Sequence, residues 1–186
     1  MSKYLNVNSP IGDEVHSQTG TPRHAHLAAI AMGSNLGDSY SILRSALAVI
    51  SETPNISLQA QSSIYRTVAV GPPQPDYLNA CIIISTALDP EALLDRLLEI
   101  EAQFGRVRHE RWGPRLLDLD LLLFDDLVVR LPQLTVPHPR MSERAFVLVP
   151  LNDVAPHWVE PISGKAIAEL VQQVDCSGVD RLYVND

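Results

Sequence analysis

Residues 116–124 read LLDLDLLLF, the most apolar of the strands that the sequence predicts. Side chains on a strand alternate between its two faces, so Asp118 and Asp120 are expected to point the same way. The opposite face is expected to pack against a core, and it is formed by Leu117, Leu119, Leu121 and Leu123. A strand with one apolar face needs a partner layer, so this segment predicts a sheet that is covered by helices.

The segments before and after residues 116–124 supply the other strands and helices of the predicted fold. Asp38 and Asp89 are predicted helix N-caps, the second followed by proline and glutamate, and each precedes apolar residues at helical spacing. Strands are expected over 26–32, 56–65, 78–88 and 116–124, a hairpin over 127–136, and helices over 143–151 and 167–174. The order predicts an α+β fold with a ferredoxin-like βαββαβ core, helices packed on a mostly antiparallel sheet, and C-terminal helices.

Length and composition restrict the class of protein. The chain has 186 residues, 46% hydrophobic, with a formal net charge of −8, which fits one domain and argues against a general nucleic-acid binder. No apolar run reaches the ~20 residues that cross a bilayer. We expect residues 1–25 to be a flexible tail without a secretory signal, and 26–186 to be a single domain. The two isolated cysteines suit a reducing cytoplasm, and we expect a cytoplasmic monomer.

Asp118 and Asp120 suggest a metal site. Two carboxylates ~6 Å apart on one strand face repel by roughly 3 kcal/mol at an effective dielectric constant near 20. A hard divalent cation would offset this repulsion, because Mg²⁺ prefers oxygen ligands. The spacing also permits a pair of bridged ions. The alternative, a solvated polar edge of an amphipathic strand, stays open on this pattern alone.

An arginine-rich loop precedes the strand. It concentrates four of the chain's 12 arginines within ten residues, at Arg106, Arg108, Arg111 and Arg115. The planar guanidinium group fits phosphate oxygens bidentately. A metal-bound polyphosphate between the arginines and the aspartates would satisfy both charges. A surface loop that pairs with acidic neighbours is the alternative.

Three further residues fit a flat heterocyclic ligand. Trp112 lies inside the arginine loop, and Tyr77 and Asn79 share one face of the strand after a proline-rich loop. An aromatic ring and an amide can stack on such a ligand and hydrogen-bond it. Ordinary packing aromatics remain the alternative. The VPHPR segment ending at Arg140 could add phosphate donors, and the GSNLG segment at 33–37 is expected to form a tight turn.

Taken together, these motifs resemble the 6-hydroxymethyl-7,8-dihydropterin pyrophosphokinases of folate biosynthesis. The resemblance runs in family order from about His26 to Ala155, and its most specific block is RWGPR at 111–115 followed by Asp118 and Asp120. It implies transfer of the pyrophosphoryl group of ATP to the hydroxymethyl group of the pterin, with release of AMP and use of two Mg²⁺ ions.

The resemblance also implies roles for individual residues. Asp118 and Asp120 would hold the metal ions, and Arg106, Arg115 and Asp120 would be catalytic. The pterin would contact Thr67, Val70, Tyr77, Asn79, Trp112 and Phe146. The nucleotide would contact Glu101, Arg108, Arg115, His138 and Arg144. ATP and the pterin are the only partners implied, with no nucleic acid and no membrane.

The chain departs from some family members at two positions near the nucleotide, where Leu98 and Gln133 stand in place of a glutamine and an arginine. Two other classes of protein share some of these features and remain to be distinguished. One is a different magnesium-dependent nucleotidyl transferase on a ferredoxin-like sheet, which would share the paired aspartates but not the Trp112 and Tyr77 elements. The other is a noncatalytic RNA-binding module, which would need sheet aromatics and a basic face.

Overall fold

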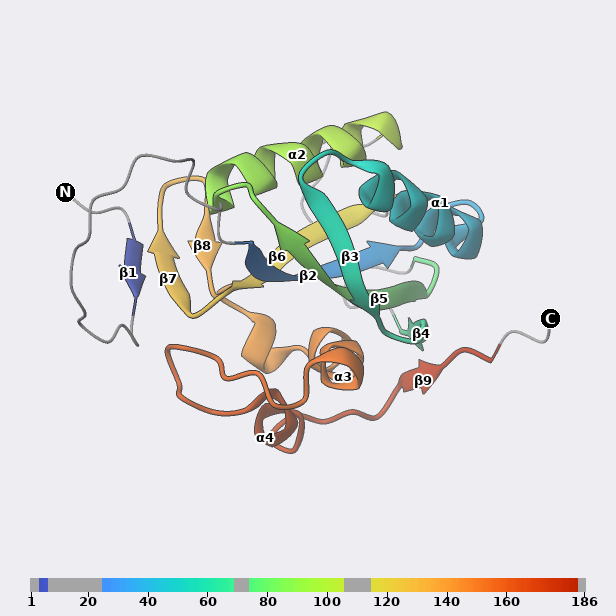
Figure 1. Ribbon diagram of the computed structural model, residues 1–186. Coiled ribbons are helices and arrows are strands. Elements are labelled where there is room, and N and C mark those ends of the chain that lie inside the picture. The colour runs from blue at the N-terminus through green and yellow to red at the C-terminus, as the bar shows by residue number, and fades with distance from the viewer. Residues whose placement is uncertain (1–3, 7–24, 69–73, 106–114, 184–186) are drawn as a thin grey trace, which may run out of the picture.

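A computed structural model gives the structure of residues 4–6, 25–68, 74–105 and 115–183. Figure 1 shows a mixed α and β arrangement with helices on both faces of one sheet. The helices are α1 (Ser39–Glu52), α2 (Pro90–Gln103), η1 (Met141–Glu143, a 3₁₀ helix), α3 (Ala145–Val154) and α4 (Ile167–Val171). The strands are β1 (Tyr4–Asn6), β2 (His26–Ser34), β3 (Ile56–Gln61), β4 (Tyr65–Thr67), β5 (Tyr77–Thr86), β6 (Asp118–Phe124), β7 (Leu127–Arg130), β8 (Thr135–Val136) and β9 (Val179–Arg181).

The main sheet has the strand order of a ferredoxin-like core. β2 lies in its middle and pairs antiparallel with β5 on one side and with β6 on the other, and β3 pairs antiparallel with β5. The four strands therefore run β6-β2-β5-β3, and α1 and α2 each connect two of them. The expected βαββαβ core and the α+β class are confirmed.

Two hydrophobic cores hold the layers together, one on each face of the sheet. α1 and α2 cover the first core through Leu43, Ile50, Leu93 and Leu97. α3 and α4 cover the second core on the opposite face (Figure 1). Because both faces of the sheet are covered, β5 is buried along most of its length, and its central residues are almost wholly apolar.

The helix starts follow the sequence signals. The Asp38 side chain accepts a hydrogen bond from the Ser41 backbone N–H, and Asp89 accepts one from Ala92. These bonds satisfy amide groups that have no partner within the helix, as N-caps do. Both caps agree with the sequence prediction.

A β-bulge in β6 changes which leucines face which core. Ala29 pairs with Leu123 and Ile30 pairs with Leu121, so Leu122 is an extra residue. The alternation shifts by one residue at the bulge. Leu123 therefore packs in the second core with Leu122, and the prediction that it shares a face with Leu117, Leu119 and Leu121 is wrong.

Three strand assignments also differ from the prediction. The predicted strand over 56–65 is split into β3 and β4, and Ser62 in the break bonds Cys81 through its backbone N–H and its hydroxyl oxygen. β9 was not predicted, and it pairs with β4 at the edge of the sheet. β1 falls within the predicted tail but pairs with β7 in a small second sheet with β8. The hairpin over 127–136 is confirmed.

No helix in the described part of the chain combines the length and the apolar character needed to span a membrane.

Candidate active site

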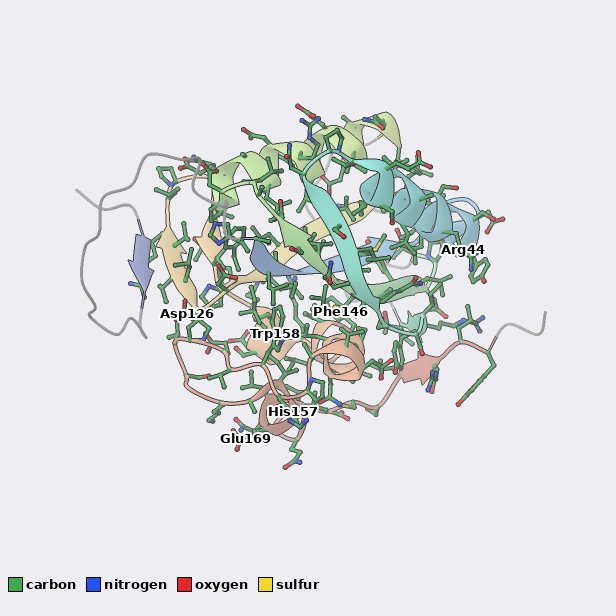
Figure 2. All side chains as sticks on the ribbon, viewed as in Figure 1. Arg44, Asp126, Phe146, His157, Trp158 and Glu169 are labelled. Atoms are coloured by element: carbon green, nitrogen blue, oxygen red, sulfur yellow. The ribbon has the colours of Figure 1, made fainter. Side chains whose placement is uncertain are left out.

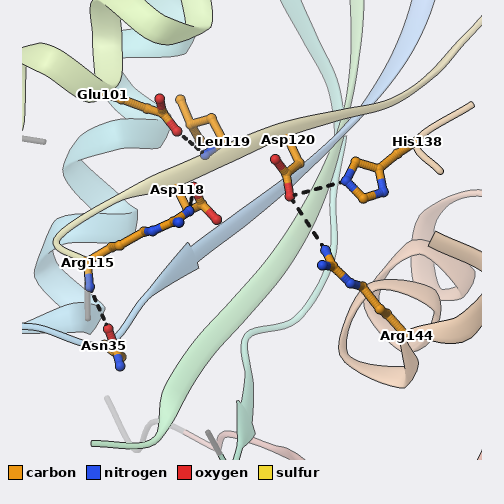
Figure 3. Close-up of polar contacts among 8 residues, drawn as sticks. All are labelled: Asn35, Glu101, Arg115, Asp118, Leu119, Asp120, His138 and Arg144. Carbon is orange, nitrogen blue, oxygen red and sulfur yellow. Dashed lines mark hydrogen bonds and ion pairs between the residues drawn. The ribbon is translucent and has the colours of Figure 1, made fainter. Parts of the chain in front are cut away.

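The first half of β6 places the two aspartates on one face of the sheet. Asp118 pairs with Gly33 of β2 and Asp120 pairs with Ala31. Leu119, between them, packs into the core beneath α1 and α2, so the carboxylates project from the other face. The expected shared face is confirmed by this register, and Figure 3 shows both side chains.

Arg115 neutralises Asp118. Its Nη1 lies 2.7 Å from Oδ1 of Asp118, and both side chains are partly exposed. Burial disfavours the charge of Arg115, but Asp118 more than offsets this, together with Tyr77 and Asp120, and the pKa of Arg115 is raised. The guanidinium group of Arg115 is therefore held in its charged form beside the Asp118 carboxylate.

Two nitrogen-bearing side chains, His138 and Arg144, approach Asp120 from the segment that follows the hairpin. Nε2 of His138 lies 3.8 Å from Oδ2 of Asp120, and Nη1 of Arg144 lies 3.9 Å from the same oxygen (Figure 3). The His138 backbone N–H donates to the carbonyl of Leu122, the bulge residue, which fixes this segment against β6. The bulge that redirects the leucines thus also positions His138.

The ring of His138 has a defined orientation. Its Nδ1 accepts a hydrogen bond from the backbone N–H of Arg140, so the neutral ring carries its proton on Nε2, facing Asp120. Burial lowers the pKa of His138, and the charges of Arg144 and Arg140 add to this effect against the opposing influence of Asp120. The pKa of Arg144 is also lowered, by burial and by Arg140. A further anion at this place would relieve the crowding of positive charge.

Glu101 hydrogen-bonds the backbone of β6 between the two aspartates. It lies in α2, is fully buried, and its Oε1 accepts a hydrogen bond of 2.7 Å from the Leu119 backbone N–H. This amide sits between the two aspartates on the strand at the end of the main sheet. The resemblance predicts a nucleotide contact for Glu101, but in this structure its carboxylate faces the strand backbone.

Asn79, which is expected to bind a flat heterocycle, lies in one row with Gly33 and Asp118. Gly33 pairs with Asp118 on one side and with Asn79 on the other, so the three lie across adjacent strands. With strands spaced by about 4.8 Å, Asp118 and Asn79 are about 10 Å apart at the backbone. The amide of Asn79 donates to the Thr67 hydroxyl at 2.7 Å, in a buried position.

Gly33 keeps this row open. A Cβ atom added there would lie 3.2 Å from Oδ1 of Asn79 and 3.9 Å from atoms of Asp118 and Tyr77. A glycine inside a strand often marks such a close approach. The sequence alone predicts only a turn at Gly33. Its position directly after a predicted strand was the one feature that could have indicated a close approach to neighbouring strands.

Tyr77 lies next to Gly33 in this row, and Phe146 lies next to Arg144. Tyr77 begins β5 and is partly buried, which raises its pKa. Phe146 lies at the start of α3 and packs against the second core, between helix and sheet with Trp158 (Figure 2). The guanidinium carbon of Arg144 lies 5.5 Å from the centroid of the Phe146 ring, so a cation and an aromatic face lie together here.

Four predicted site residues, Val70, Arg106, Arg108 and Trp112, lie outside the described residues. Apart from Glu101, the described ones fall into two neighbouring groups. Asp118, Asp120, Arg115, His138 and Arg144 form the charged group, and Thr67, Tyr77, Asn79 and Phe146 form the aromatic and amide group.

The charged group fits Mg²⁺ only together with a ligand. Within the described ranges, no set of three or more histidine, cysteine, aspartate or glutamate side chains could hold a metal ion. Mg²⁺ is commonly held by one or two carboxylates plus substrate phosphates. Two carboxylates flanked by arginines match that arrangement.

Comparison with known proteins agrees with this geometry. The sequence profile of the family described as 7,8-dihydro-6-hydroxymethylpterin-pyrophosphokinase (HPPK) matches residues 29–156. The 2-amino-4-hydroxy-6-hydroxymethyldihydropteridine pyrophosphokinase of Synechocystis sp. is 47% identical over 163 residues, covering 88% of this chain and 84% of the relative. The enzyme of the same name from Haemophilus influenzae is 47% identical over 147 residues, covering 78% of this chain and 91% of the relative.

Solved structures show the same fold at low sequence identity. Wild-type HPPK-DHPS of Plasmodium falciparum has a TM-score of 0.65 at 15% identity, and the match covers 80% of this chain. A triple mutant of that protein with pteroate has a TM-score of 0.69 at 15% identity, with 86% of this chain covered. The chain spans under half the length of these structures, 44% and 45% respectively. From the profile match and the identity to the relatives, the chain belongs to the 7,8-dihydro-6-hydroxymethylpterin-pyrophosphokinase family.

Proposed function

We propose that this protein transfers the pyrophosphoryl group of ATP to the hydroxymethyl group of 6-hydroxymethyl-7,8-dihydropterin, releasing AMP, in folate biosynthesis. One observation carries the proposal beyond family membership: Asp118 and Asn79 occupy one row across Gly33. A site for the charge of a polyphosphate and a site for a heterocycle therefore adjoin. The names of the related enzymes support the same reaction.

The aromatic and amide group would bind the pterin. Asn79 and Thr67 provide hydrogen-bonding groups for the ring edge, and their mutual bond holds them in place before a ligand arrives. We propose Phe146 and Trp112 as the two stacking faces, with Tyr77 at one edge and Val70 as a further contact. Gly33 leaves the space in which the hydroxymethyl group would reach toward Asp118.

The charged group would bind the triphosphate of ATP. Arg115 and Arg144 are fixed by their partners on β6 and α3, and their guanidinium groups suit phosphate oxygens. His138 offers an N–H donor on Nε2. We propose that Arg106 and Arg108 add to this set, with Arg106 and Arg115 catalytic, and that Glu101 acts on the nucleotide side by fixing the Leu119 amide.

Asp118 and Asp120 would hold two Mg²⁺ ions with the phosphates. Bound there, the ions supply neutralisation of the charge that develops during transfer. The pterin hydroxyl oxygen attacks the β-phosphorus, the bond between that phosphorus and the oxygen bridging to the α-phosphate breaks, and AMP leaves. Asp120, whose carboxylate is the more exposed of the pair, is placed to accept the hydroxyl proton.

The remaining expectations extend this proposal to the whole chain. We propose a cytoplasmic monomer whose residues 26–186 form one domain. We propose that residues 1–25 form a tail outside this domain; the tail contains β1, which pairs with β7.

Product analysis tests the proposed function directly. The purified protein is incubated with ATP, Mg²⁺ and the hydroxymethyl pterin, and the nucleotide product is separated by chromatography. We expect AMP in equal amount to pyrophosphorylated pterin, and none when the pterin lacks its hydroxyl group. Formation of ADP, or of AMP without modified pterin, would contradict the proposal.

A further inference from the structure

Asn35 is a buried polar residue that none of the assigned roles uses. It follows the last residue of β2, and only 2% of its surface is exposed. A buried amide costs free energy unless it is hydrogen-bonded, and that cost is about 1–3 kcal/mol in proteins. Its partners therefore indicate what the residue does.

One side of Asn35 holds Arg115. Its Oδ1 accepts a hydrogen bond of 2.8 Å from the Arg115 backbone N–H. Its own backbone N–H donates to the Arg115 carbonyl oxygen at 3.0 Å. Figure 3 shows Asn35 beneath the backbone of Arg115, whose side chain reaches Asp118.

The other side of Asn35 holds the segment that leads into β5. Its Nδ2 donates to Oε1 of Gln74 at 3.0 Å and to the carbonyl oxygen of Pro75 at 3.1 Å. Tyr77, the first residue of β5, follows two residues later. One side chain thus joins segments that are 39 and 80 residues away in the sequence.

The neighbouring turn does not require Asn35. Asp38 caps α1, and Gly37, with a φ of +67°, makes the turn before the helix. The three hydrogen bonds of the Asn35 side chain to described residues go to Arg115 and to residues 74–75 rather than to α1.

We infer that Asn35 is a positioning residue that sets Arg115, on the phosphate side, against the strand that carries Tyr77 and Asn79, on the pterin side. The inference rests on the proposed function for the identity of the two sides. Its carbonyl oxygen fixes Arg115, and its NH₂ group fixes the approach to β5. The two halves of the amide therefore predict separable effects.

Two substitutions separate these halves. Asn35→Asp keeps an oxygen that accepts from Arg115 but cannot donate to Pro75. Asn35→Ala removes both contacts. Thr86→Val is a matched control, because Thr86 is equally buried and its hydroxyl donates to the Asn55 carbonyl at the far end of β5.

Steady-state kinetics provide the first readout. For Asn35→Asp we expect the KM for the pterin to rise by about tenfold with kcat changed by less than about threefold. For Asn35→Ala we expect kcat to fall by about tenfold as well, because Arg115 loses an anchor. Thr86→Val should lower the melting temperature without altering either constant. Equal losses in the three variants, or unchanged constants in both Asn35 variants, would overturn the inference.

Hydrogen exchange provides a second readout that does not need turnover. Asn35→Ala should speed amide exchange both at Arg115 and at residues 74–77, while Asn35→Asp should do so only at 74–77. Faster exchange confined to the turn at 33–37 would contradict the inference. If the wild-type protein forms no AMP, the proposed function fails, and the exchange pattern still decides whether Asn35 joins these segments.

Discussion

At the scale of single residues, the two aspartates differ in their surroundings. Asp118 is held by Arg115 at 2.7 Å, whereas Asp120 lies 3.8 and 3.9 Å from His138 and Arg144. The Asp120 side chain is also the more exposed, at 37% against 25% for Asp118. Asp118 thus forms a close ion pair with Arg115, whereas the Asp120 carboxylate is more accessible to a ligand.

Replacing either aspartate by asparagine should strongly reduce transfer and leave the fold intact. We expect Asp118→Asn and Asp120→Asn to lower kcat by about 10²-fold or more, since each removes a charge needed for transition-state stabilisation. The free energy of unfolding, measured in urea, should change by less than about 1 kcal/mol, because the ion pairs of both aspartates are partly exposed. Near-normal turnover in either variant would exclude its assigned role.

Gly33 provides a test of the row that joins the two groups. In Gly33→Ala the new methyl group would lie 3.2 Å from Oδ1 of Asn79. We expect the KM for the pterin to rise by about tenfold, with a smaller change in the KM for ATP. Because Gly33 does not have a positive φ, the backbone accepts alanine and the free energy of unfolding should change little. An unchanged KM for the pterin would show that it binds elsewhere.

Residue patterns identified the charged pair but not its supports. The Asp-Leu-Asp alternation predicted a shared face, and the register confirms it. Asn35 and Gly33 were read only as turn residues, because their importance depends on partners 39 to 85 positions away, such as Gln74 and Asp118. Contacts of this range follow from strand order, which local periodicity does not contain.

At the scale of elements, the sequence predicted the strongly patterned segments best. The capped helices α1 and α2 begin where Asp38 and Asp89 indicate. The bulge in β6 could not be predicted, since an all-leucine run carries no signal of where the alternation shifts. β9 is short and polar, and it is defined by its pairing with β4 rather than by its own residues.

The hydrogen bond between Tyr65 and Asp153 joins the end of α3 to β4. The hydroxyl of Tyr65 donates to Oδ2 of Asp153 at 2.9 Å in a part-buried position, and the Ser63 amide donates to the same oxygen. Tyr65→Phe should therefore lower the free energy of unfolding by about 1–2 kcal/mol. Tyr183→Phe, at a residue 81% exposed, is the control and should have no comparable effect.

The same pair predicts a pH dependence. Burial, with the hydrogen bond to Asp153, raises the pKa of Tyr65 from 10.0 to about 12. A raised pKa means that the folded state keeps the proton longer than the unfolded state. This contribution to stability is complete below pH 10 and is lost as the pH rises toward 12. In an alkaline titration followed by tyrosinate absorbance, the wild-type protein should show a late step from the ionisation of Tyr65. This step should be absent in Tyr65→Phe and present in Tyr183→Phe. If Tyr65→Phe instead lost an early step, the assignment would be contradicted.

At the scale of the whole molecule, the two faces of the main sheet are covered by helices to different extents. On one face, α1 and α2 cover the first core. On the other face, α3 covers only part of the sheet (Figure 1), and Phe146 in its first turn packs against the second core (Figure 2). The active site thus forms where the second helical layer stops.

The central claim is that Asp118 and Asp120 together hold the cations that accompany the nucleotide. Titration of Mn²⁺ in the presence of a non-hydrolysable ATP analogue, followed by electron paramagnetic resonance, measures bound ions per chain. The account predicts two bound ions in the wild-type protein, and the loss of at least one in the Asp118→Asn/Asp120→Asn variant. Two equally tight ions in that variant would contradict it.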